Sequence, residues 1–159
     1  ELSDIGARHS DRLRALIYLD AAWDRTYVPP PDPNGGKAFD KLGIKSQPKP
    51  DANHFDPQKE LGAGVQRPDY KHIQVPALAL YGAPRTWSEL MPGVKPADEA
   101  AAQSVVKAFA GTRRHMIEQF QTEIPNGRAI EIQGAGHYLF RTHEAEVLRE
   151  IRAFLKALP

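Results

Sequence analysis

The C-terminal stretch "IEIQGAGHYLFRTHEAEVLREIRAFL", Ile130–Leu155, decides the fold class of this chain. It begins inside a strand predicted over Arg128–Gly134 and turns through a glycine-rich link. It then enters a helix predicted over Thr142–Leu158, with Thr142 in the N-cap position and apolar residues three and four apart. A buried strand that leads through a short turn into an amphipathic helix is typical of parallel α/β sheets.

Two further strands are predicted before this stretch. Leu16–Leu19 is an apolar run without polar interruption, and Ile73–Gly82 ("IQVPALALYG") is another. Residues 1–10 have the pattern of a helix end, and a long helix is predicted over about Ala97–Gln121. Its core-facing stripe contains Val105, Phe109, Met116 and Phe120. This alternation predicts an α/β fold, with a three-layer arrangement of a parallel sheet and flanking helices joined by right-handed crossovers.

The segment 25–72 interrupts the alternation. Seven of the 14 prolines fall between Pro29 and Pro57, and neither strand nor helix periodicity is present. Long irregular segments in compact domains are commonly lids or binding loops. We therefore expect residues 1–159 to form one partial domain, with 25–72 as a lid or cap-like insertion.

The composition excludes several classes of protein. The chain is 41% hydrophobic and 26% charged, with a net charge of +1, so a nucleic-acid partner is not expected. It contains no membrane-length apolar run and no cysteine, which excludes a predicted membrane span, disulfides and thiolate metal sites. The "DANH" motif at Asp51–His54 lacks a second group of ligands, so neither a metal nor another cofactor is expected.

The first residues suggest that the chain is part of a longer fold. It starts at Glu1 rather than methionine, and Leu2 and Ile5 already follow a helical pattern. We expect additional sequence before Glu1, and strands within it that cover the free edge of the first predicted strand.

Polar residues follow the carboxyl ends of all three predicted strands, which is where sites form in open α/β sheets. A histidine beside a carboxylate supplies two of the three members of a nucleophilic triad. The alternative is that the histidine is only a structural turn residue. The strand-end residues are Asp20, Asp24, Arg85, Ser88, Glu89 and His137; Trp23, Tyr27, Trp87, Met91 and Tyr138 follow the same ends and could line an apolar pocket.

The pieces "ALIYLDAA", "VPALALYG" and "GAGHYLF", in this order and spacing, resemble the C-terminal half of the α/β-hydrolase fold. The resemblance covers nearly the whole chain apart from the lid, and it implies that His137 is the catalytic histidine. Many relatives carry the acid in the turn that reads "YGAPRTW" here, which contains none. Others place it at the end of the strand after the nucleophile, where this chain has Asp20. Asp24 and Glu89 remain alternatives.

The nucleophile of this family lies in a G-x-S-x-G elbow, which this sequence lacks. The resemblance implies an elbow shortly before Glu1, together with part of the oxyanion hole, so the 159 residues alone are expected to be inactive. The implied activity is hydrolysis of a small apolar carboxylic ester by a Ser-His-Asp triad. The alternatives are an aspartate nucleophile, as in haloalkane dehalogenases and epoxide hydrolases, and a non-catalytic ligand-binding scaffold.

Overall fold

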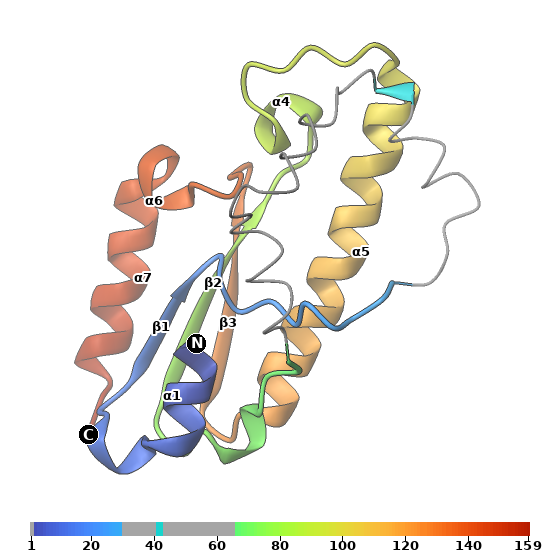
Figure 1. Ribbon diagram of the computed structural model, residues 1–159. Helices are drawn as coiled ribbons and strands as arrows, with labels where there is room; N and C mark the ends of the chain where they lie inside the picture. Colours follow the sequence, from blue (N-terminus) through green and yellow to red (C-terminus); the bar gives the residue numbers. More distant parts are fainter. Residues whose placement is uncertain (1, 30–40, 43–65) are drawn as a thin grey trace, which may run out of the picture.

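A computed structural model describes residues 2–29, 41–42 and 66–159 (Figure 1). Most of the predicted lid, and all of the "DANH" motif, lie outside the described residues. The helices are α1 (Leu2–Arg8), α4 (Trp87–Leu90), α5 (Glu99–Glu123), α6 (Leu139–Thr142) and α7 (Glu144–Lys156). The strands are β1 (Leu16–Leu19), β2 (Ala77–Ala83) and β3 (Gly127–Gln133), and two 3₁₀ turns span Ser10–Arg12 and Tyr70–His72.

The three strands form a parallel sheet in the order β1-β2-β3. The register pairs Leu19 with Leu80 and Leu80 with Ile130, so the carboxyl ends of all three strands lie at one edge of the sheet. β2 is the central strand, and each of its residues is buried. Its apolar sequence is therefore what a strand covered on both faces requires.

Helices cover both faces of the sheet (Figure 1). Alternate strand residues point to opposite faces, so Tyr18 and Ala79 pack with Met116 and Phe120 of α5 on one side. Leu78, Leu80 and Ile132 pack on the other side against Val147 and Phe154 of α7. The predicted α/β class with a parallel sheet between helical layers is confirmed.

Several element boundaries differ from the predictions. β2 begins at Ala77 instead of Ile73, because the chain reaches it through the 3₁₀ turn at Tyr70–His72 and through Pro76, which has no N–H for the ladder. α5 continues without a break through Gly111. Phe109, predicted to face the core, is 42% exposed.

The helix predicted from Thr142 is divided in two. Thr142 is the last residue of α6, and His143 precedes α7 without forming a side-chain cap. Thr142 is therefore not the N-cap. Tyr138, whose backbone oxygen accepts from Arg141, instead starts the short helix directly after the glycine-rich link.

A small, separate apolar cluster lies beyond the end of β2, between α4 and the first half of α5. It joins Trp87 to the described residue Leu42 and to Ala102 and Val105. None of the helices in the described ranges combines the length and apolar character needed to cross a lipid bilayer.

Candidate active site

Asp20 lies at the point where β1 ends. Its backbone N–H still donates to Leu80 O at 2.7 Å, so it completes the ladder between β1 and β2. Its φ of +50° is in the left-handed region, which aspartate tolerates better than most residues. The indole Nε1 of Trp23 donates to Asp20 O at 2.8 Å and holds this turn of the backbone. Strained backbone at a strand end is a common feature of functional sites.

The carboxylate of Asp20 connects the ends of all three strands. Its Oδ1 accepts from the backbone N–H of Gly82 in β2 at 3.0 Å. Its Oδ2 lies 2.8 Å from Nδ1 of His137, which follows β3. Asp20 is only 6% exposed, so the Gly82 bond is buried and the His137 contact is partly buried. The sequence prediction that these strand ends bring an acid and a histidine together agrees with this geometry.

The glycine-rich link sets the position of His137. Gly134 has a φ of +78°, which lets the chain turn as it leaves β3. A Cβ at Gly136 would lie 2.4 Å from the backbone oxygen of Glu89, so this residue passes too close to α4 for any side chain. The two glycines together lay the link over the end of β2 and direct it to Asp20.

Burial dominates the electrostatics of the acid. It raises the pKa of Asp20 above its ordinary value of 3.8. The hydrogen bonds from His137 and Gly82, and the positive charge of Arg113, lower the pKa without cancelling the effect of burial. Asp20 is therefore a carboxylate whose negative charge is incompletely compensated, and a positive charge on the neighbouring imidazole would be stabilised.

His137 presents the other half of its ring to solvent. Its side chain is 67% exposed, and Nδ1 is occupied by Asp20. No residue of the described ranges hydrogen-bonds to Nε2. A neutral imidazole that donates through Nδ1 carries its lone pair on Nε2, so this nitrogen is available to accept a proton.

A cavity of about 300 Å³ opens beside this pair. Asp20, Arg113 and His137 supply its charged and polar side chains. The remaining lining residues are Trp23, Gly82, Pro84, Leu90, Met91, Phe109 and Gly136. A mostly apolar cavity with a few convergent polar groups is typical of a small-molecule site.

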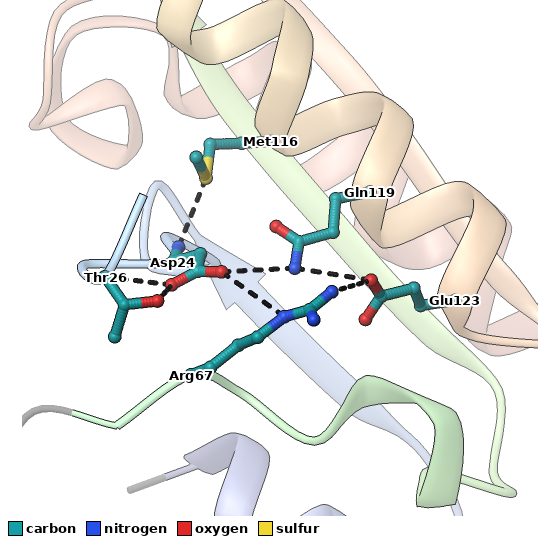
Figure 2. Close-up of polar contacts among 6 residues, drawn as sticks. All are labelled: Asp24, Thr26, Arg67, Met116, Gln119 and Glu123. Carbon is teal, nitrogen blue, oxygen red and sulfur yellow. Dashed lines mark hydrogen bonds and ion pairs between the residues drawn. The ribbon is translucent and has the colours of Figure 1, made fainter. Parts of the chain in front are cut away.

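The structure does not bring Asp24 to His137. Its Oδ1 accepts from the backbone N–H of Thr26 at 2.9 Å, and its Oδ2 accepts from Gln119 at 3.2 Å. Arg67 lies between Asp24 and Glu123 and pairs with both (Figure 2). Burial alone would raise the pKa of Asp24, but the Thr26 and Gln119 hydrogen bonds and the Arg67 charge outweigh it and lower the pKa. Asp24, directly before the predicted lid segment, thus joins α5 to Arg67 near the end of that segment.

Glu89 also lies apart from the histidine. Its Oε2 accepts from the backbone N–H of Arg85 at 2.6 Å, which stabilises the turn into α4. Of the three candidate acids, only Asp20 contacts His137.

Arg113 is a cavity residue that the sequence analysis did not select. The run Arg113–His115 has the pattern of a solvated helix face, but Arg113 is only 8% exposed and pairs with Glu131 at 2.7 Å. His115 stacks on Tyr27 with ring centroids 3.8 Å apart. The only usable signal was spacing, since Arg113 is three residues before Met116 and seven before Phe120, on their face of α5.

The expected pocket residues divide in a similar way. Trp23 and Met91 line the cavity. Trp87 is buried in the separate cluster beside α4, and Tyr27 stacks on His115. Tyr138 is 59% exposed and contacts His137 by its ring edge.

No serine of the described ranges contacts His137. Ser3 bonds to Tyr18, Ser10 to the backbone oxygen of Gly6, Ser88 to Thr86 and Ser104 to the backbone oxygen of Ala100. Within the part of the chain that the structure covers, no three histidine, aspartate or glutamate side chains gather as metal ligands do.

Comparisons with protein-family models, with curated proteins and with solved structures gave no match for this chain.

Proposed function

We propose that Asp20 and His137 are the acid and the base of a hydrolase of the α/β-hydrolase type, acting on carboxylic esters. The observation that supports this most strongly is the 2.8 Å contact between Asp20 Oδ2 and His137 Nδ1. It joins a buried carboxylate at the end of β1 to a histidine after β3, and leaves Nε2 facing no partner among the described residues. This is the relation of acid to base in a nucleophilic triad.

In the proposed reaction, Nε2 of His137 takes the proton of a serine hydroxyl as the serine oxygen attacks the ester carbonyl. Asp20 keeps the ring oriented and stabilises the imidazolium. The proton then passes to the departing alcohol as the C–O bond breaks. A water molecule, deprotonated by the same nitrogen, hydrolyses the resulting acyl-enzyme. In this proposal the serine is supplied by sequence that precedes Glu1.

The cavity supports a small, largely apolar substrate. Its volume is about 300 Å³, and Trp23, Leu90, Met91 and Phe109 supply apolar surface beside His137. A short acyl group in this cavity would lie next to the nitrogen that accepts the proton.

The test is ester hydrolysis by the longer protein that includes the preceding sequence. With p-nitrophenyl butyrate, His137→Ala is expected to lower kcat by about 10⁴-fold or more, because members of a triad act as a unit. His143→Ala is the matched control, since His143 does not line the cavity and its side chain hydrogen-bonds, among the described residues, only to the neighbouring Thr142. Near-normal turnover in His137→Ala, with a folded protein, would refute the proposal.

Ligand binding without catalysis is the second candidate. It is favoured by one observation, namely that the cavity and the Asp20–His137 pair occur without a nucleophile at hydrogen-bonding distance in the described ranges. Assays on the longer protein distinguish the hydrolase from the ligand-binding function. Absence of hydrolysis with every ester tried, together with saturable binding of the same esters, would select the binding function.

A further inference from the structure

Arg113 brings a buried positive charge to the cavity. It extends from α5, is 8% exposed, and lines the cavity together with Asp20 and His137. Its Nε donates to Glu131 Oε1 on β3 at 2.7 Å. Its charge also lowers the pKa of Asp20, which places the guanidinium electrostatically within the site.

The residues that the structure describes use little of the hydrogen-bonding capacity of this guanidinium. An arginine has five N–H donors, and within the described ranges only the Nε donor has a protein acceptor. The enclosed side-chain atoms without partners in those ranges are Tyr70 Oη and Gln119 Oε1. The Nη atoms of Arg113 are not among them, and Arg113 itself lines the cavity. Because the side chain is otherwise enclosed and lines the cavity, we place these donors at the cavity.

The ion pair with Glu131 does not require this burial. Glu131 has a side chain that is 36% exposed, and its second oxygen also accepts from Gln133 at 3.2 Å. An exposed arginine could pair with it at lower cost, since removing a guanidinium from water is unfavourable unless its donors are satisfied. Four donors without an acceptor among the described residues, at a largely apolar cavity, fit an oxygen-rich ligand group.

We propose that Arg113 binds a carboxylate carried by the ligand of this cavity. The two Nη groups match the two oxygens of a carboxylate, which is the geometry of a bidentate pair. Under the proposed function, on which this step rests, the substrate is a short ester whose acyl part ends in a carboxylate. The monoester of a small dicarboxylic acid is such a compound, and the binding of the carboxylate itself does not depend on catalysis.

The two tryptophans of the chain allow a direct binding test. Trp23 lines the cavity, whereas Trp87 bonds to Val94 O and lies outside it. Pentanoate and pentanamide are titrated separately into the protein, and the two indole N–H signals are followed by NMR. We expect pentanoate to shift the Trp23 signal and not that of Trp87. Its Kd should be about tenfold below that of pentanamide, as expected for charge-assisted hydrogen bonds.

Three variants test whether Arg113 causes the preference for pentanoate over pentanamide. Arg113→Gln should bring the two Kd values together. Arg114→Gln, which makes the same charge change on the exposed neighbouring residue, should leave the preference intact. Glu131→Gln removes the competing carboxylate and should increase the preference for pentanoate several-fold, which keeps the proposal testable if Arg113→Gln does not fold.

Equal binding of the two probes to the unmodified protein would overturn the proposal, as would the absence of a Trp23 shift with either probe. A preference unchanged in Arg113→Gln or in Glu131→Gln would do the same. Hydrolysis by the longer protein is scored separately. An inactive protein that prefers pentanoate rejects only the proposed function, and an active esterase without the preference rejects only the role of Arg113.

Discussion

Substitution of Asp20 separates the contributions of its charge, its hydrogen bonds and its backbone conformation. Asp20→Ala removes the acceptor of the buried Gly82 N–H, which costs about 1–3 kcal/mol. It also places alanine at a φ of +50°, which costs roughly 1–2 kcal/mol more. The free energy of unfolding should therefore fall by about 2–5 kcal/mol.

Asp20→Asn has a different expected outcome. Asparagine keeps an oxygen for Gly82 and tolerates the left-handed region, so we expect its stability at neutral pH to lie within about 1 kcal/mol of the unmodified protein. It also removes a buried charge that the protein stabilises incompletely.

The pH dependence follows from the raised pKa of Asp20. Between the ordinary value of 3.8 and the raised pKa, the folded state binds more protons than the unfolded state. The contribution of Asp20 to stability is thus fully present below 3.8 and is lost as the pH rises through the raised pKa. The stability difference between the unmodified protein and Asp20→Asn should shift in favour of Asp20→Asn over that window.

Urea unfolding, followed by circular dichroism from acidic to neutral pH, measures the stability of Asp20→Ala, the stability of Asp20→Asn and the pH dependence of both relative to the unmodified protein. The reasoning fails if Asp20→Ala loses less than about 0.5 kcal/mol, since that is below the cost of one unsatisfied buried donor. It also fails if Asp20→Asn is as destabilising as Asp20→Ala, or if its stability relative to the unmodified protein does not change with pH.

Three further substitutions test other parts of the structure by the same unfolding assay. Gly136→Ala should destabilise the fold by more than about 2 kcal/mol, because its Cβ would overlap the Glu89 oxygen. Gly111→Ala should stabilise it by about 0.5–1 kcal/mol, because no atom lies within 4 Å of the new Cβ in mid-helix; a loss of stability there contradicts the continuous α5. Asp24→Asn should remove the stability contribution of the Asp24 carboxylate, which is present above pH 3.8 and is lost as the pH falls through the lowered pKa. If stability at acidic pH depends on pH as in the unmodified protein, the cluster in Figure 2 is contradicted.

The sequence was sufficient for the sheet. The strands at Leu16–Leu19 and Gly127–Gln133 were predicted to within a residue. Leu16–Leu19 was found from its uninterrupted apolar run, which a strand covered on both faces requires. β2 was predicted four residues too early, since the apolar residues before Pro76 belong to the approach to the sheet and not to its ladder.

Local signals failed where tertiary contacts decide the outcome. Thr142 has the chemistry of an N-cap, but the turn after His137 forms its own short helix and Thr142 closes it. Phe109 follows the apolar period of α5, but it lies beyond the sheet, where the cavity replaces a packed core.

The candidate site was predictable in part. Asp20 and His137 follow strands that the sequence reveals, so their meeting at one sheet edge follows from topology. The choice among Asp20, Asp24 and Glu89 required coordinates. The sequence does not show that the Asp24 carboxylate accepts hydrogen bonds from Thr26 and Gln119. Arg113 was missed because a charged side chain predicts solvent exposure, although its spacing from Met116 and Phe120 places it on their face of α5.

The most direct measurement is the tautomer of His137 in this chain, from long-range ¹H–¹⁵N NMR at about pH 9, where an ordinary imidazole is neutral. Donation from Nδ1 to Asp20 predicts a ring protonated on Nδ1, with an unprotonated Nε2 able to act as a base. In Asp20→Asn the amide can donate to Nδ1, so the proton should move to Nε2. A ring protonated on Nε2 in the unmodified protein, or the same tautomer in both proteins, would contradict the assignment of Asp20 and His137 as acid and base.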